Sequence, residues 1–358
     1  MPNILIDARA IADCKSGGIN RVARLWIIEQ TKSYSPQNCH CITTGLKPSE
    51  EVRRFCDQND FNYIHLTIPN KIWTFFCRLN LASLILSAEH KLKQPVDLLL
   101  LPNIAYTGAL YRPYHILVHD LSFIIEPKWF SFKRRLWHKY IDAPRRIANA
   151  DEIHCVSNQT KSDVKRLLSI DDAKCHIFHF DPKLEVRSPG FEVRSEIRNT
   201  PAPRSFSEGG KYEIRPSWLP STAKRFILLL GGSDPRKNII VALKAIAEFN
   251  IRHPQKYLTP LVLGGKVNFP AGHKIACVQA PGFIKDDVLY WLYQNAAALL
   301  YPSWYEGFGL PLHEAHQFNT PVIASTAGAL PETAPPNTIF CHPAKIHEWI
   351  QTLELIEL

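Results

Sequence analysis

Apolar residues along this chain follow two patterns that alternate from one end to the other. Short unbroken apolar runs predict strands buried on both faces of a sheet, at 3–7, 39–43, 96–101, 116–118, 153–156, 174–180, 226–230, 260–264 and 296–301. Between them, helical spacing of apolar residues predicts helices, chiefly at 22–28, 71–93, 129–146, 160–168, 239–251, 286–295 and 346–356. This alternation in both halves predicts an α/β fold of two Rossmann-like, doubly wound domains that face a cleft.

The domain boundaries are expected where the composition changes. A chain of 358 residues is long for one core and sufficient for two domains. We expect an N-terminal domain over 1–184 and a C-terminal domain over 225–358, and we expect the latter to be short at its C-terminus. Residues 185–224 are rich in Pro, Ser, Gly and charge. We interpret them as an inserted, largely disordered linker.

Composition and charge narrow the class of protein. Hydrophobic residues make up 46% and aromatic residues 11% of the chain, which excludes disorder as a whole. A net charge of +9 favours an anionic partner, such as nucleotide phosphates, a phospholipid surface or nucleic acid, although a merely basic soluble enzyme is a common alternative. The nine cysteines include no Cys-x-x-Cys pair, so we expect reduced thiols in a cytoplasmic protein and no metal site. Neither a signal peptide nor a membrane-spanning segment is expected.

The most informative stretch for chemistry follows the strand predicted at 296–301. Glu306 lies in a loop, and Glu314 lies eight residues later in the first turns of a predicted helix. Gly307 and Gly309 would let the backbone approach a ligand near the positive end of that helix. Carboxylates for hydroxyl groups and amides for phosphate suit a nucleotide sugar. A turn with two solvated acids is an equally good interpretation of the spacing alone.

The segment 306–314, with the sequence EGFGLPLHE, resembles the Glu-x7-Glu motif of the retaining glycosyltransferases of family 4, which have the GT-B fold. Residues 315–332 continue the likeness. The resemblance implies that Glu306 contacts the donor sugar and Glu314 the ribose of the nucleotide. It also implies that the residues between them line the donor site, namely Gly307, Phe308, Gly309 and Leu310.

Further stretches of the C-terminal half carry the same resemblance. The loop 231–238 is similar to the family's diphosphate loop, which implies that Lys237 binds phosphate. Gly232 stands where the family often has Arg, so Arg236 is a candidate to compensate. Gly282 and Phe283 lie in a turn that the resemblance places beside the nucleotide base.

Two stretches of the N-terminal half complete the resemblance. Gly17 and Gly18 are similar to the family's first glycine-rich loop, which implies a place near donor and acceptor, although a plain turn is the better interpretation of a bare Gly-Gly by itself. His119 follows a predicted strand, the usual position of a site residue in such sheets. The resemblance implies that it binds the donor sugar and positions the transition state. Asp120 either orients the ring of His119 or caps the following turn.

The resemblance implies retaining transfer of a hexose from a nucleoside diphosphate sugar to a glycan or lipid-linked acceptor in surface polysaccharide synthesis. His119, Glu306 and Lys237 would be the catalytic residues, without metal or cofactor, and GDP-mannose is the first expected donor. The alternative is an impaired relic that binds nucleotide without turnover. It is suggested by Gly232, the insert, the short C-terminus and the segment 179–182, where the family usually has an Asn-Gly turn.

Two segments combine basic and aromatic residues. Residues 71–93 are predicted to form a core helix or, alternatively, an interfacial helix on anionic lipid. Residues 129–146 are predicted to form a helix that contacts an anionic acceptor or the inner face of a membrane. The alternative is a helix beside the cleft whose cationic side chains are solvated. A third interpretation, nucleic-acid binding through residues 133–146, predicts steeply salt-dependent association, but no RNA-binding motif accompanies it.

Overall fold

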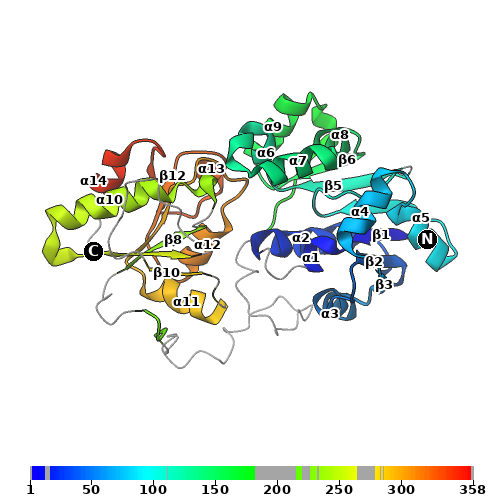
Figure 1. Cartoon of the computed structure of the whole chain (residues 1–358), viewed down its shortest axis with the longest axis horizontal. Helices are drawn as coiled ribbons and strands as arrows, with labels where there is room; N and C mark the ends of the chain where they lie inside the picture. Colours follow the sequence, from blue (N-terminus) through cyan, green and yellow to red (C-terminus); the bar gives the residue numbers. More distant parts are fainter. Residues whose placement is uncertain are drawn as a thin grey trace. The chain divides into compact units, whose positions relative to one another are not determined.

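Two parallel sheets, one in each of two units, form the protein (Figure 1). The computed structural model describes residues 2–12, 17–110, 112–181, 215–219, 226–231, 234–263, 279–282, 284 and 286–355. The units comprise Met1–Phe180 and Asp181–Leu358. Most of the expected linker at 185–224 lies outside the described residues, but Leu219 packs into the core of the C-terminal unit.

The N-terminal sheet has the strand order β3-β2-β1-β4-β5-β6-β7, and every pair is parallel. Its strands are β1 (Ile4–Asp7), β2 (Cys39–Thr44), β3 (Asn62–Leu66), β4 (Leu98–Leu101), β5 (Tyr114–Val118), β6 (Glu152–Cys155) and β7 (Cys175–Ile177). The direction of winding reverses between β1 and β4. Ligands of open α/β sheets bind beside such a switch point, at the carboxyl ends of the strands.

Helices connect these strands, and their ends follow local sequence signals. The longer ones are α2 (Gly17–Thr31), α3 (Glu50–Asn59), α4 (Asn70–Arg78), α5 (Leu84–Leu92), α7 (Phe132–Ile141), α8 (Ala143–Ala148) and α9 (Asn158–Leu168), and the short ones are α1 (Arg9–Ala12) and α6 (Ser122–Ile125). Ser157 caps α9, because its Oγ accepts a hydrogen bond from the Thr160 amide at 3.1 Å.

The two longest helices predicted in this unit are each interrupted. The predicted helix at 71–93 is α4 and α5, separated by Asn80, which has a left-handed φ of 57°. The predicted helix at 129–146 is a 3-10 turn followed by α7 and α8, with Asp142 at a φ of 50° between the two helices. Asn and Asp tolerate this conformation better than most residues. Both predictions of one continuous helix are therefore wrong.

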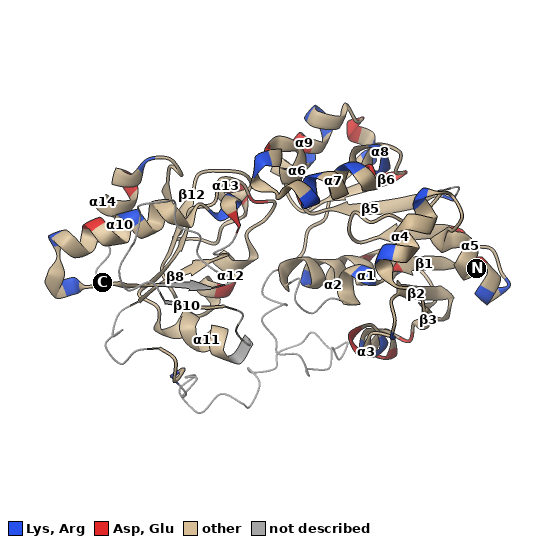
Figure 2. Cartoon of the chain, viewed as in Figure 1, with Lys and Arg blue, Asp and Glu red and all other residues tan. Residues whose placement is uncertain are grey.

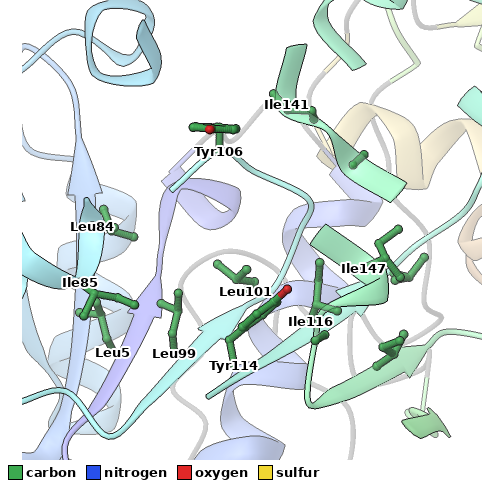
Figure 3. Packing of buried hydrophobic residues seen from close by; sticks show 14 of the residues in the cluster. Leu5, Leu84, Ile85, Leu99, Leu101, Tyr106, Tyr114, Ile116, Ile141 and Ile147 are labelled. Carbon is green, nitrogen blue, oxygen red and sulfur yellow. The ribbon is translucent and has the colours of Figure 1, made fainter. Parts of the chain in front are cut away.

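Apolar strand residues and helices form the N-terminal core. Leu5, Leu99 and Ile116 point from neighbouring strands into one cluster, in which Leu84 and Ile85 of α5 lie beside Leu5 and Ile147 lies beside Ile116 (Figure 3). These side chains are almost completely buried. The continuous apolar runs of the sequence thus correspond to central strands.

The C-terminal sheet repeats the same winding, in the order β10-β9-β8-β11-β12-β13. Its strands are β8 (Phe226–Leu230), β9 (Thr259–Leu263), β10 (Gln279–Gly282), β11 (Ala298–Tyr301), β12 (Val322–Ser325) and β13 (Ile339–Cys341). The switch point lies between β8 and β11. The expected fold class, two doubly wound α/β units of GT-B type, is confirmed.

Both faces of this sheet are covered, because successive strand residues point to opposite sides. Ile227 and Leu229 pack with α10 (Ile239–Arg252) and α14 (Ile346–Leu355). Phe226 and Leu228 pack with α11 (Asp286–Asn295) and α12 (Leu310–Gln317). The short α13 (Leu330–Thr333) follows β12.

Seven cysteines lie within the described residues, and all are free and buried: Cys39, Cys41, Cys56, Cys77, Cys155, Cys175 and Cys341. Burial raises the pKa of Cys39 and of Cys77 to about 11, so both remain protonated thiols near neutral pH. Over the described part of the chain, every helix is too short or too polar to span a membrane.

Candidate active site

The switch point of the C-terminal sheet brings together two loops that the sequence predicted to bind the donor. Lys237 ends the 3-10 turn Pro235–Lys237 after β8, and Glu306 lies in the loop after β11. The Lys237 Nζ donates hydrogen bonds to Glu306 Oε1 at 2.7 Å and to Tyr301 Oη at 2.5 Å. Only 17% of the Lys237 side chain and 10% of the Glu306 side chain are exposed. A buried ion pair therefore occupies the position where α/β sheets bind ligands.

The charges of this pair are fixed by its surroundings. Burial alone would lower the pKa of Lys237, but the Glu306 carboxylate and the Tyr301 hydroxyl raise it above its ordinary value. Burial, reinforced by Glu306, raises the pKa of Tyr301 well above its ordinary value. Lys237 is therefore a permanent cation beside a neutral phenol throughout the physiological pH range.

Two glycines shape the backbone around the pair. Gly231 has a φ of 86°, and a Cβ there would lie 2.6 Å from Lys237 Cγ. Gly328 has a φ of 61°, and a Cβ there would lie 2.6 Å from the Glu306 nitrogen. The Glu306 carbonyl also accepts a hydrogen bond from the Ala329 amide at 2.9 Å. At both positions the backbone lies so close to its neighbours that only a residue without a side chain fits.

Glu314 is held separately from the ion pair. It lies on α12, is 8% exposed, and its Oε2 accepts a hydrogen bond from the Tyr293 hydroxyl at 2.8 Å. Gly309 precedes α12 with a φ of 96°, and a Cβ there would lie 2.6 Å from Leu330 Cδ2. Glu306 is also 8% exposed. The interpretation of two solvated acids in a turn is therefore wrong.

The other residues expected near the donor have varied surroundings. Arg236 forms a salt bridge of 2.9 Å with Asp234, and its carbonyl accepts a hydrogen bond from the Trp304 amide at 2.7 Å. Phe308 stacks on His313, with ring centroids 5.3 Å apart. Gly282 ends β10 with a φ of 83° and open space around its Cα. Gly232 and Phe283 lie outside the described residues.

In the N-terminal unit, His119 follows β5 beside the switch point. Its Nε2 lies 2.9 Å from the Pro102 carbonyl oxygen, which can only accept, so Nε2 carries the proton. Burial lowers the pKa of His119, and the hydrogen bond to Pro102 offsets this only in part. The ring is therefore neutral near pH 7, with Nδ1 available as a hydrogen-bond acceptor.

Asp120, next to His119, was predicted either to orient the His119 ring or to cap the following turn. Asp120 Oδ1 accepts hydrogen bonds from the Ser122 amide at 2.9 Å and from its hydroxyl at 2.6 Å, so Asp120 caps the following turn.

Gly17 and Gly18 begin α2, and Gly17 has a φ of 43° with open space around it.

Comparison with known proteins relates these features to a family. Residues 210–358, the greater part of the C-terminal unit, match the family model of glycosyl transferases group 1. Over these residues the chain is similar to the group 1 glycosyltransferases. Sequence relatives of the chain include O-antigen chain mannosyltransferase B of Escherichia coli, 32% identical over 142 residues, or 35% of this chain and 37% of that protein.

Two further relatives align over longer stretches. MMP alpha-(1->4)-mannosyltransferase of Mycolicibacterium hassiacum is 26% identical over 57% of this chain and 44% of its own length. O-antigen chain mannosyltransferase RfbU of Salmonella typhimurium is 22% identical over 70% of this chain and 63% of its own length. The alignments thus cover between 37% and 63% of these three relatives.

Solved structures match this chain over nearly its whole length. Sucrose-phosphate synthase from Thermosynechococcus elongatus has a TM-score of 0.63 at 18% identity, covering 99% of this chain and 89% of that one. The lipopolysaccharide outer core galactosyltransferase WaaB has a TM-score of 0.55 at 15% identity, covering 99% of this chain and 90% of that one. At these identities the matches support the fold alone.

Several polar residues of the candidate site escaped prediction from the sequence. Tyr301 ends the apolar run 296–301 and Tyr293 lies within the helix predicted at 286–295, yet their hydroxyls contact Lys237 and Glu314. At the N-terminal switch point, Arg9 forms a 2.6 Å salt bridge with Asp7. In the sequence, Asp7 and Arg9 stand at the end of the first apolar strand, and this charged pair was the signal that could have indicated them as site residues.

Within the described residues, one group of side chains could hold a metal ion. His115, Glu152 and His154 offer ligand atoms that all lie within 4.8 Å of one another. The three residues lie at the amino ends of β5 and β6, opposite the edge that carries His119. Imidazole and carboxylate ligands suit Zn²⁺. In the described structure, His154 Nε2 instead lies 3.2 Å from Glu152 Oε2, and His115 Nδ1 lies 3.1 Å from Gln30 Oε1.

Proposed function

We propose that this protein transfers a hexose from a nucleoside diphosphate sugar to a hydroxyl of a glycan or lipid-linked acceptor, with retention at the anomeric carbon. The observation that carries the proposal is the buried Lys237–Glu306 pair at the switch point of the C-terminal sheet. Similarity to the group 1 glycosyltransferases adds support for sugar transfer. Mannose is the first candidate because several relatives are named mannosyltransferases.

The hydrogen bonds of Lys237 leave room for a ligand. An ammonium group has three N–H donors, and Glu306 and Tyr301 accept two of them. The third can donate to an oxygen of the donor diphosphate. The carboxylate of Glu306 likewise keeps acceptor capacity for sugar hydroxyls while it holds the lysine.

In the proposed reaction, the bond between the anomeric carbon and the phosphate oxygen breaks, and the acceptor oxygen bonds to the same face of the sugar. The electron pair of the broken bond stays with the diphosphate, where Lys237 stabilises the negative charge. The leaving phosphate takes the proton of the acceptor hydroxyl. We assign Nδ1 of His119 to a sugar hydroxyl and Glu314 to the ribose. No metal ion is required.

A product screen tests the proposal. The protein is incubated with GDP-mannose and with UDP-sugars in the presence of glycan and lipid-linked acceptors, and products are identified by mass. Lys237→Met is expected to abolish transfer and to weaken GDP binding at least tenfold. Lys244→Met removes an exposed lysine of α10 and is the matched control, with both properties unchanged. Transfer by Lys237→Met at the unmodified rate would overturn the assignment.

A nucleotide-binding protein without turnover is the second candidate. One observation favours it: Asp234 holds Arg236, the residue expected to compensate at the diphosphate loop. Calorimetry with GDP and UDP, followed by a donor-hydrolysis assay, separates the two proposals. Binding without any turnover across donors and acceptors would favour this second candidate.

In either case we propose a cytoplasmic setting, because the seven described cysteines are unpaired.

A further inference from the structure

Two neighbouring helices of the N-terminal unit expose large apolar side chains. On α4, Trp73 and Cys77 face the core, as the core-helix interpretation predicted, while the opposite side of the helix faces outward. We call this surface the α4–α7 face, and its exposed apolar residues are Ile72, Phe75, Phe76 and Leu79 on and just after α4, and Phe132, Leu136 and Trp137 on α7. Large apolar side chains exposed in this number on two neighbouring helices favour an interaction site over an ordinary solvated surface.

Ring contacts join the two helices into one surface. The guanidinium of Arg78, at the end of α4, lies 5.7 Å from the ring centroid of Tyr140 on α7. Tyr140 stacks on Trp137, with ring centroids 5.9 Å apart. The exposed apolar residues of α4 and α7 therefore flank a shared cation and aromatic cluster.

The charge of this face has one sign. Neither α4 nor α7 contains an Asp or Glu. Figure 2 shows Lys and Arg along α7, and they are the exposed Lys133, Arg134, Arg135 and Lys139. Basic residues mixed with aromatic residues, tryptophan among them, are typical of helices that lie at the surface of an anionic bilayer.

A polar cavity of about 410 Å³ adjoins the α4–α7 face. Three arginines line it, Arg78 together with Arg145 and Arg146 of α8, against a single acid, Asp142. Among the described residues, no carboxylate lies within salt-bridge distance of these arginines. The cavity therefore has an excess of positive charge.

Arg146 is built into the floor of this cavity. Its side chain is anchored by neutral groups: Nη1 donates to Thr107 Oγ1 at 3.1 Å and Nη2 to the Gly108 carbonyl at 3.0 Å. The guanidinium also lies 4.1 Å from the ring centroid of Tyr106. The residue is only 9% exposed. A buried cation with neutral partners is stabilised when an anion enters beside it.

We propose that the arginine cavity binds the phosphate of an anionic membrane lipid while the α4–α7 face inserts its apolar side chains into the bilayer surface. Arg78 lines the arginine cavity and also ends α4, so one lipid could place its phosphate in the cavity and its acyl chains beside the α4–α7 face. Planar guanidinium groups match phosphate oxygens with paired hydrogen bonds. The proposal uses residues of the N-terminal unit outside the candidate active site, and it stands independently of sugar transfer.

Vesicle flotation of the full chain tests the proposal. Vesicles of phosphatidylcholine with one-third phosphatidylglycerol are compared with vesicles of phosphatidylcholine alone. The variant Arg78→Gln/Arg145→Gln removes two exposed cations of the cavity. The matched control, Arg53→Gln/Arg54→Gln, removes two exposed cations of α3. GDP binding and thermal unfolding of each variant confirm that it is folded.

The protein is expected to bind the anionic vesicles and to bind phosphatidylcholine alone at least tenfold more weakly. A basic residue at an anionic surface contributes roughly a factor of five in affinity. The cavity variant should therefore lose about 30-fold and the control less than threefold. Phe132→Ser/Leu136→Ser, which keeps every charge, should also lose at least tenfold.

Other outcomes would overturn the proposal. Equal losses for the cavity variant and the control would mean that net charge alone attracts the protein to lipid. Full competition by inorganic phosphate at low millimolar concentration would identify the cavity as a site for free phosphate. Tighter, salt-sensitive binding of oligonucleotides than of vesicles, lost in the same cavity variant, would assign the face to nucleic acid.

Discussion

Replacing Lys237 by methionine should destabilise the C-terminal unit more than any loss of packing explains. Methionine keeps the length and apolar stem of the side chain, so it fills the space beside Gly231. It removes the cation that pairs with Glu306. The carboxylate, 10% exposed in its side chain, is then left without its ionic partner.

Removal of one partner from a buried ion pair costs about 3–5 kcal/mol, because the remaining charge stays desolvated. In a unit of this size, each kcal/mol lowers the melting temperature by about 2–4 °C. Lys237→Met should therefore melt about 6–20 °C below the unmodified protein. Adding Glu306→Gln removes the stranded charge, so the double variant should recover most of this stability.

Hydrogen exchange as a function of urea measures the effect within the unit itself. Amides of β8 and β11 report its free energy of unfolding, since both are central strands. The double variant should recover stability while GDP binding remains lost, which separates folding from ligand binding. Lys244→Met should lie within about 0.5 kcal/mol of the unmodified protein. A cost below about 1 kcal/mol for Lys237→Met, or a double variant no more stable than the single one, would refute the buried-pair argument.

Three further predictions concern other parts of the chain. Gly328→Ala places a Cβ 2.6 Å from the Glu306 nitrogen, so the loop must move; thermal unfolding should fall by several degrees and transfer at least tenfold. Tyr293→Phe removes one hydrogen-bond donor to the buried Glu314, which should cost about 1–3 kcal/mol in urea unfolding; a cost near zero would mean that this hydrogen bond does not stabilise the unit. Burial lowers the pKa of His154 to about 4, against about 6.5 when unfolded, so its contribution to stability is complete above pH 6.5 and lost as the pH falls toward 4. The free energy of unfolding of the N-terminal unit should therefore fall by up to about 3 kcal/mol as the pH is lowered from 6.5 to 4, and His154→Gln should remove part of this pH dependence.

The general course of the fold could be predicted because central strands carry uninterrupted apolar residues. The runs that became β1, β4, β8 and β11 are buried on both faces, and parallel strands place their carboxyl ends at one edge. The meeting of Lys237 with Glu306 followed from that geometry and from the family resemblance. The strand β3 was missed because its sequence, with Asn, Tyr and His among five residues, lacks a continuous apolar run.

The remaining details depend on tertiary contacts that leave little trace in local sequence. Neither Asn80 nor Asp142 is a Gly, so the residue type alone does not distinguish a left-handed residue from one more helical turn. Pro144, two residues after Asp142, was the available signal for the second break. The role of Gly328 is visible only once the loop after β12 is seen against Glu306. A tyrosine hydroxyl at the end of an apolar strand, as in Tyr301, reveals its partner only in three dimensions.

The distribution of thiols gives this protein a built-in reporter of local opening. Six of the seven described cysteines belong to the N-terminal unit, and only Cys341 belongs to the C-terminal one. Because each is shielded, alkylation at each of these sites must wait for the surrounding structure to open. Mass spectrometry of labelled peptides would therefore time the opening of each half separately, in the unmodified protein and without any engineered probe.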